Sequence, residues 1–148
     1  MSYTINKRKI INDPVYGFIN IPGELIFDIT EHLWFQRLRN IRQLGLTSFV
    51  YPGANHSRFQ HCLGALHLMD TALKTLKEKG IPITPEEEEA ALVAILLHDI
   101  GHGPFSHALE TSIISGITHE DLSLLLMKML NEEFGGKLRL AIGIFTGS

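Results

Sequence analysis

Apolar residues recur at helical spacing along most of the chain. Residues 57–79 and 119–134 predict two helices, and residues 137–148 begin like a further amphipathic helix. In residues 90–97 the apolar run is unbroken, so the helix that contains it is expected to be central and buried. Residues 104–110 predict one short helical turn. The pattern indicates a mainly α-helical fold.

Capping signals set several of these boundaries. Thr84 is followed by a proline and, three positions later, by Glu87, a capping box that starts the apolar helix. This helix is expected to end near Gly101. Thr118 caps the next long helix, and the glycine pair at 135–136 stops it.

The first part of the chain follows a less regular pattern. Residues 8–21 predict a β-hairpin around an Asp13-Pro14 turn, because β-branched and aromatic residues lie on both sides. After Pro22 we expect one long helix that has Thr30 as a candidate N-cap and ends at Gly45. Its apolar residues at helical spacing are Trp34, Leu38 and Ile41. The 148 residues fit a single domain, with the hairpin at 8–21 and a helical core at 22–148.

Composition and charge narrow the classes of function. Thirteen Lys and Arg against 16 Asp and Glu give a net charge of −3, which argues against nucleic-acid binding through bulk charge but leaves a small anionic substrate open. The unbroken apolar run is 8 residues long, and a membrane span needs roughly 20. The N-terminal stretch lacks the apolar segment of a secretory signal, and the single Cys62 cannot form an internal disulfide. We therefore expect a cytoplasmic protein without membrane association.

The sharpest chemical signal is the His98-Asp99 pair at the end of the apolar helix. The interior desolvates the carboxylate, and a helix C-terminus disfavours negative charge, so a cation is expected to compensate. A divalent metal shared with the imidazole would do so; a buried, hydrogen-bonded His–Asp pair is the alternative. His102 and His107 follow within nine residues of His98, on a turn that Gly101 and Gly103 make tight. This grouping favours a metal site with proton-transfer partners.

A second group of candidates lies upstream. Arg58 and His61 are three residues apart and share one helix face. Gly64 and Ala65 continue that face, and their small size is expected to let this helix approach the His98-Asp99 helix closely. A packed core histidine is the alternative role for His61. His67 lies off this face and is interpreted as structural or solvated.

The remaining candidates are one histidine and a set of arginines. His119 begins the last long helix, whose N-terminus favours a neutral imidazole, and an exposed first-turn histidine is the alternative. Three arginines opposite an apolar stripe form either a solvated face or anion contacts: Arg37, Arg39 and Arg42. Imidazoles, one carboxylate and an arginine together suit a metal-activated water that attacks phosphorus. The sequence has no P-loop, nucleophile signature or Rossmann glycine pattern.

Five strings of residues carry a family resemblance. They occur in order within residues 9–121: NDPVYGFI, FQRLRNIRQLG, YPGANHSRFQHCLG, LLHDIGHGPFSH and THED. In these strings the chain resembles the HD-domain metal phosphohydrolases. Among them it is most similar to the deoxynucleoside triphosphate triphosphohydrolases, including the animal enzyme with a sterile-alpha-motif domain. The resemblance implies an HD-domain helical bundle with a short N-terminal β-hairpin. It also implies hydrolysis of a deoxynucleoside triphosphate to nucleoside and triphosphate, by a homo-oligomer that nucleotides activate in some members.

The resemblance implies roles for individual residues. The implied metal ligands are His61, His98 and Asp99. The implied contacts to the phosphate next to the sugar are Arg58 and His102. His107 resembles the proton donor, and His119 an accessory active-site histidine. The implied sugar contacts are Gln43, which senses the 3′-hydroxyl, and Leu44. The implied cofactor is a divalent metal, namely iron, manganese or magnesium, with zinc as a further candidate.

The family's pattern continues beyond what this sequence contains. Its fourth metal ligand is an aspartate well downstream of the His–Asp pair, in a region that also holds groups that bind the triphosphate. No aspartate in this sequence occupies that position. We therefore expect a truncated HD domain, with Asp121 or Glu120 as a lesser alternative ligand. Two other interpretations stay open. One is an HD-scaffold module that binds nucleotide or supports assembly without turnover, and the other is an inactive fragment with exposed apolar surface.

Overall fold

The computed structural model describes residues 9–105 and 116–148. The chain starts with an antiparallel hairpin of strands β1 (Ile10–Asp13) and β2 (Gly17–Asn20). Asp13 shapes its turn, because Oδ1 accepts the backbone N–H groups of Val15 and Tyr16 at 2.8 and 2.9 Å. Ile19 on β2 is fully buried and anchors the hairpin to the core. The predicted hairpin is confirmed.

The prediction of one long helix after Pro22 is wrong, because the helix is interrupted at His32. Helix α1 (Glu24–Glu31) ends there, and His32 has an extended backbone with φ −67° and ψ 142°. The His32 side chain instead caps the short helix α2 (Leu33–Gln36), which runs into the 3₁₀ helix η1 (Arg37–Asn40). Thr30 is not an N-cap: it lies inside α1, and its hydroxyl donates to the Phe27 carbonyl.

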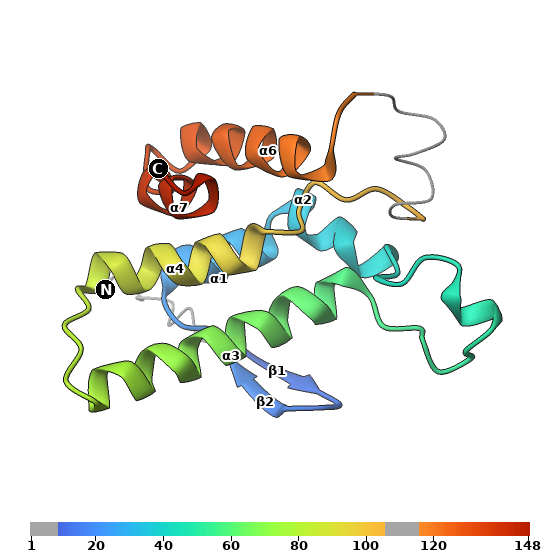
Figure 1. The fold of residues 1–148 in the computed structure, drawn as a ribbon, viewed down its shortest axis with the longest axis horizontal. Coiled ribbons are helices and arrows are strands. Elements are labelled where there is room, and N and C mark those ends of the chain that lie inside the picture. The colour runs from blue at the N-terminus through green and yellow to red at the C-terminus, as the bar shows by residue number, and fades with distance from the viewer. Residues whose placement is uncertain (1–8, 106–115) are drawn as a thin grey trace, which may run out of the picture.

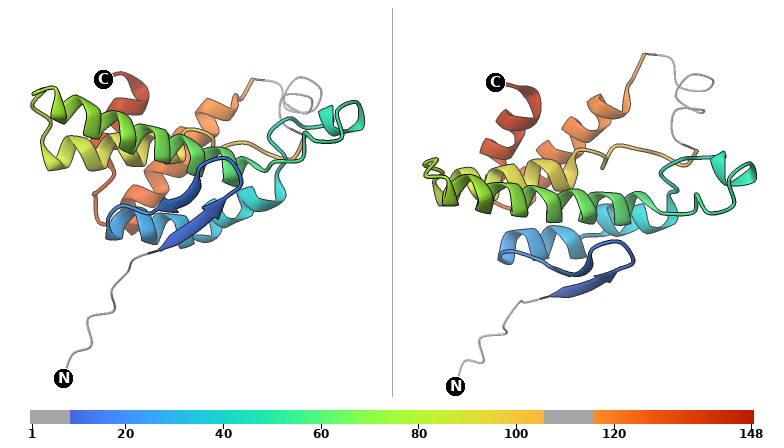
Figure 2. Two further views of the ribbon diagram at one scale, coloured as in Figure 1. Left: turned by 90° about the horizontal axis from the view of Figure 1, so that it is seen from below. Right: turned by 60° about the horizontal axis from the view of Figure 1, so that its bottom comes forward.

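Two long helices form the centre of the fold. Helix α3 (Arg58–Glu78) and helix α4 (Pro85–Leu97) lie side by side in antiparallel order (Figures 1 and 2). Both begin with complete capping boxes, based on Ser57 and Thr84. In each box the cap hydroxyl accepts the backbone N–H of the third helical residue. The side chain of that third residue in turn accepts the backbone N–H of the cap. The predicted start of the apolar helix is confirmed.

The remaining helices cover the other side of this pair. Helix α6 (His119–Glu133) starts at the predicted Thr118 cap, and helix α7 (Arg139–Thr146) packs against α4. Figure 2 shows the α3–α4 layer between the hairpin and α1 on one side and α6 and α7 on the other. As expected, α4 is deeply buried: Leu92, Val93, Leu96 and Leu97 are each at most 3% exposed.

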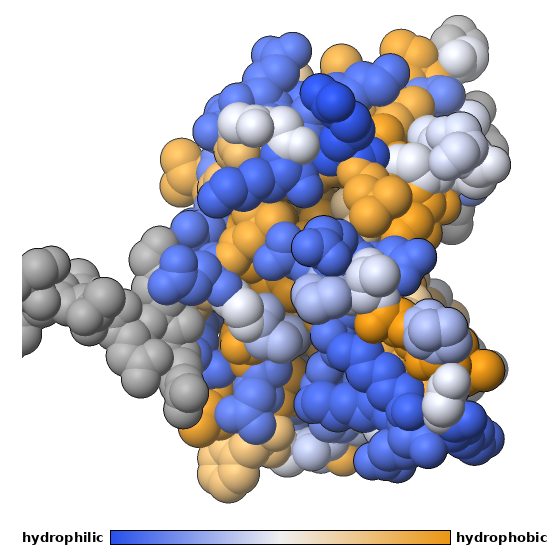
Figure 3. Space-filling model, turned by 90° about the vertical axis from the view of Figure 1, so that its left-hand side faces the viewer, coloured by the Kyte–Doolittle hydropathy of each residue, from blue (hydrophilic) through white to orange (hydrophobic). Residues whose placement is uncertain are grey.

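Apolar side chains also remain at the surface. The large ones in the loop before α3, which contains the 3₁₀ helix η2 (Thr47–Phe49), include Phe49, Val50 and Tyr51, between 66% and 83% exposed. Figure 3, a view of another side, also shows hydrophobic patches between hydrophilic ones. None of the helices within residues 9–105 and 116–148 has the length and apolarity that a membrane span requires. The short turn expected at 104–110 lies largely outside the described residues.

Candidate metal centre

The backbone after α4 forms the base of the candidate site. We call residues 98–102 the His-Asp turn; it follows directly on the last residue of α4. The His98 Nδ1 lies 2.6 Å from the carbonyl oxygen of Ile95. Because a carbonyl only accepts, Nδ1 carries the proton, and in the neutral ring Nε2 keeps its lone pair. Metal-binding histidines are usually held in this way by their second ring nitrogen.

Two side chains lie close to this lone pair. His61 Nε2, from the second turn of α3, lies 3.2 Å from His98 Nε2. The Asp99 carboxylate oxygens lie 3.6 Å from His61 Nε2 and 3.5 Å from His98 Nε2. One ligand atom from each residue lies within 4.8 Å of the other two. Two imidazole nitrogens and one carboxylate oxygen are a donor set that divalent iron, manganese and zinc accept, so these residues fit a metal.

Arg58 supplies the cation that the buried Asp99 requires. The first residue of α3, it is only 4% exposed, and its Nη1 donates to Asp99 Oδ2 at 2.5 Å. His102 Nε2 lies 3.4 Å from the other carboxylate oxygen. Burial acts to raise the pKa of Asp99, but the hydrogen bond from His102 and the electrostatic effects of His98 and Arg58 outweigh it and hold that pKa well below its ordinary value. Asp99 is therefore ionised.

Burial has the opposite effect on two histidines. It lowers the pKa of His61, and the nearby Asp99 carboxylate counteracts only part of this. It also lowers the pKa of His102, which is 2% exposed, against the raising effect of its hydrogen bond to Asp99. Both rings are thus neutral at neutral pH, and a neutral His61 has a nitrogen lone pair to offer a metal.

A cavity of about 530 Å³ opens over this cluster. The 3₁₀-helical loop and the start of α6 form its walls, and Phe105 lies at its edge with a left-handed backbone, φ 64°. The His119 ring stacks on His102, with centroids 4.0 Å apart and planes at 17°. Seven of the nine candidates line the cavity: Gln43, Leu44, Arg58, His61, Asp99, His102 and His119. His98 adjoins it through His61, and His107 lies outside the described residues.

Gln43 is held in place by His56, which directly precedes the cap of α3. His56 Nε2 lies 2.7 Å from the Gln43 side-chain oxygen, and the Gln43 backbone N–H donates to the His56 carbonyl. The Gln43 carbonyl accepts from Arg58 Nη2 at 3.3 Å. The loop is thereby tied to the start of α3.

One expectation about the surroundings of the site needs correction. A Cβ on Gly64 would lie 3.1 Å from the Tyr16 ring, so this face of α3 receives the hairpin rather than α4. Ala65 lines a cavity shared with the same turn. His67 packs its ring against Tyr16, with 5.1 Å between centroids, in line with a structural role.

The three arginines do not share one role. Arg37 donates Nη1 to the His102 carbonyl at 2.8 Å and Nη2 to the Ile100 carbonyl, and it is half-buried. Arg39 is exposed and lies over the Phe59 ring at 3.7 Å, and Arg42 bonds the Ser48 hydroxyl. Arg37 therefore belongs neither to a solvated face nor to an anion contact.

The sequence model of the HD domain matches residues 58–141, from the first residue of α3 into α7. The match includes all three residues of the metal cluster and the cavity histidines of the His-Asp turn and of α6. The chain belongs to the HD-domain family.

This HD domain has curated relatives that are much longer. It is 40% identical over 134 residues to the Dictyostelium discoideum "deoxynucleoside triphosphate triphosphohydrolase SAMHD1 homolog" and 38% over 141 residues to the Homo sapiens "deoxynucleoside triphosphate triphosphohydrolase SAMHD1". These matches cover 86% and 90% of the chain but 26% and 22% of the relatives. The chain thus spans about a quarter of these relatives' length.

A solved structure shares both fold and sequence with this HD domain. A phosphohydrolase from Bacteroides thetaiotaomicron is 59% identical and superposes with a TM-score of 0.92. The similarity covers 94% of this chain and 34% of that one. The shared fold agrees with the match to the HD-domain family.

Proposed function

We propose that this HD domain contributes the metal site and part of the substrate cavity of a metal-dependent phosphohydrolase that converts a deoxynucleoside triphosphate to nucleoside and triphosphate. The observation that carries the proposal is the convergence of His61, His98 and Asp99 at the base of a cavity lined by further candidates. The names of the Dictyostelium and human relatives support the substrate class.

The proposed ligands are His61, His98 and Asp99, and the proposed ion is iron, manganese or magnesium, with zinc a further candidate. When bound, such an ion supplies a water of lowered pKa and an electrophilic contact for a phosphate oxygen. Asp99 is ionised and His61 neutral, the protonation states that ligands need.

The protein's own groups then bind and orient the substrate. Arg58 and His102 are proposed to contact the phosphate next to the sugar, and the stacked His119 restricts the orientation of His102. Gln43, fixed by His56, is proposed to sense the 3′-hydroxyl, and Leu44, 46% exposed, to contact the sugar. His107 is proposed to protonate the leaving oxygen. We also propose that the protein acts as a homo-oligomer in the cytoplasm.

A turnover assay tests this proposal. The chain, loaded with Mn²⁺, is incubated with the four deoxynucleoside triphosphates, and nucleoside and triphosphate are quantified over time. We expect sustained release that falls by about 10²–10⁴-fold in His107→Ala, the usual contribution of a general acid. The matched control is His67→Ala, which removes a histidine that packs on Tyr16 outside the 530 Å³ cavity.

Two results would contradict the proposal. Release of single phosphates in place of triphosphate would assign another phosphohydrolase reaction to the same metal site. Stoichiometric nucleotide binding without product would instead favour an HD-scaffold module for binding or assembly.

A further inference from the structure

The His-Asp turn lies where a helix leaves its backbone groups unpaired. A helix end lacks further turns to pair its last carbonyls, and here the Leu97 carbonyl accepts the Ile100 N–H. Residues 98–102 present three of the candidate side chains. The position of His98, Asp99 and His102 therefore depends on what holds this short stretch of backbone.

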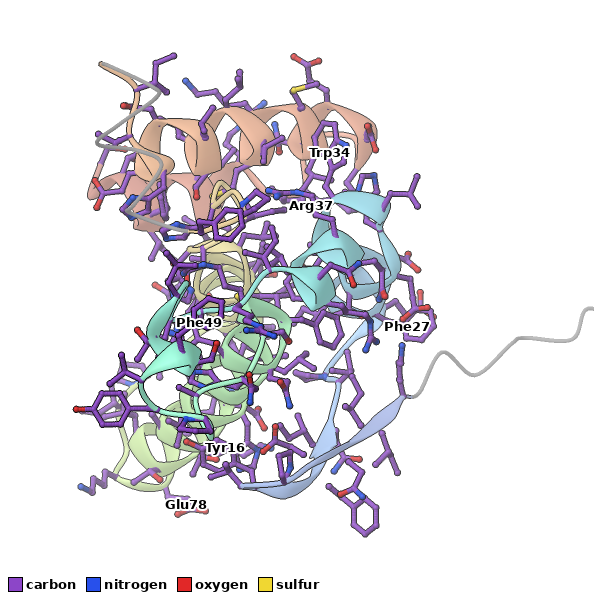
Figure 4. The ribbon with its side chains drawn as sticks, turned by 90° about the vertical axis from the view of Figure 1, so that its right-hand side faces the viewer. Tyr16, Phe27, Trp34, Arg37, Phe49 and Glu78 are labelled. Carbon is purple, nitrogen blue, oxygen red and sulfur yellow. The ribbon has the colours of Figure 1, made fainter. Side chains whose placement is uncertain are left out.

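Two side chains from distant elements hold it. Ser123 of α6 is fully buried; its hydroxyl donates to the His98 carbonyl at 3.2 Å and accepts the Gly101 N–H at 2.9 Å. Arg37 of η1 donates to the carbonyls of Ile100 and His102. Figure 4 shows Arg37 extending from the α2–η1 segment toward the interior beneath α6.

The Arg37 contact has the form of a clamp. A guanidinium group is planar and rigid, so two of its N–H groups can fix two carbonyls at a set separation. The two carbonyls flank Gly101 and lie one and three residues after Asp99. A positive charge is also favourable at the C-terminal end of a helix.

We propose that Arg37 is a positioning residue of the metal centre, which clamps the His-Asp turn through the Ile100 and His102 carbonyls so that His98, Asp99 and His102 keep the orientation needed for metal binding. This role rests on the proposed function, because it presupposes that the cluster binds a metal. Arg37 itself touches neither metal nor substrate.

Three variants test the proposal. Arg37→Met removes the clamp and retains the aliphatic bulk, and Arg37→Lys keeps the charge but cannot bridge two carbonyls in a fixed plane. Arg39→Met is the matched control, because it lies in the same 3₁₀ helix and loses only its contacts with Phe59 and Gln36. Each variant is titrated with Mn²⁺ alone, unfolded in urea, and examined by hydrogen exchange without metal.

We expect Arg37→Met to bind Mn²⁺ about 10–100-fold more weakly, as is usual when a partner of the ligand shell is removed. Arg37→Lys should lie between this variant and the parent, and Arg39→Met should bind like the parent whatever its stability. Amide exchange should quicken at residues 99–102 in Arg37→Met and remain unchanged there in Arg39→Met. A purely structural role would lower the urea midpoint without this selective change.

Unchanged Mn²⁺ affinity in Arg37→Met, with unchanged exchange at the turn, would overturn the proposal. If the parent itself binds no Mn²⁺, the proposed function fails, and exchange at residues 99–102 then decides separately whether Arg37 holds the turn. If Arg37→Met does not fold, the comparison of Arg37→Lys with Arg39→Met makes the same decision.

Discussion

The Asp99 carboxylate has two roles. It balances the charge of Arg58, and it faces His61 and His98 as a candidate ligand. The side chains of Arg58 and Asp99 are 5% and 11% exposed, so the pair is largely removed from water. Removing one partner from such a pair leaves a buried charge without compensation, which is far costlier than removing both.

A double-mutant comparison separates these roles. We expect Asp99→Asn to abolish Mn²⁺ binding and to lower the free energy of unfolding by about 3–5 kcal/mol, because the Arg58 charge is left buried. The double variant Arg58→Met/Asp99→Asn should recover much of the stability but none of the metal binding. Urea denaturation and Mn²⁺ titration measure the two quantities. Mn²⁺ retention in Asp99→Asn would remove Asp99 from the ligand set.

The local motif made most of the candidate site predictable from the sequence. His98, Asp99 and His102 are near in sequence, and a buried helix end forces any carboxylate there to find a cation. Arg58 as that cation was missed, although its spacing from His61 already placed both on one face. The roles of Arg37 and Ser123 were not predictable. Both bind backbone groups of a distant element, and the sequence around each residue carries no pattern that marks such a contact.

The elements were predictable where capping chemistry marked them. Thr84 and Thr118 start α4 and α6 as expected, each with a complete capping box. The prediction of a continuous helix after α1 was wrong for a physical reason. A histidine is not a usual N-cap, and residues three apart such as Leu38 and Ile41 fit a 3₁₀ turn as well as an α-helix.

The close contact between the His-Asp turn and α6 requires glycine at position 101. A Cβ on Gly101 would lie 2.3 Å from the His119 carbonyl oxygen and 2.3 Å from the Ser123 nitrogen, both backbone atoms of α6. A Cβ on Gly103 would meet no atom within 4 Å. These two glycines therefore differ: an added side chain would be blocked at Gly101 and free at Gly103.

We expect Gly101→Ala to push α6 away and lower the free energy of unfolding by at least about 1–3 kcal/mol, the usual range for overpacking. It should also weaken the His102–His119 stack, whereas Gly103→Ala should leave both stability and site unchanged. Thermal unfolding and the ring chemical shifts of both histidines provide the measurement. Equal effects of the two substitutions would show that the close packing of α6 on Gly101 is not needed.

The described fold is built around the α3–α4 pair: the candidate ligand His61 lies on α3, and His98 directly follows α4. A ligand that binds the folded state and not the unfolded one stabilises the protein by mass action. At a free Mn²⁺ concentration 100 times the Kd, we expect about 2.7 kcal/mol of added stability and a rise in Tm of roughly 5–10 °C. Chelator should reverse the rise, and Asp99→Asn should show none; an equal rise in that variant would indicate binding elsewhere.

The packing of α6 against the His-Asp turn divides the site into two parts that different elements carry. The candidate ligands come from α3 and from the residues directly after α4. His119 arrives on α6 and can join only after that helix docks. Local opening of α6 would separate the stacked rings and widen the cavity, and it would also withdraw the Ser123 hydroxyl from the His-Asp turn. One wall of the site thus also supports its floor.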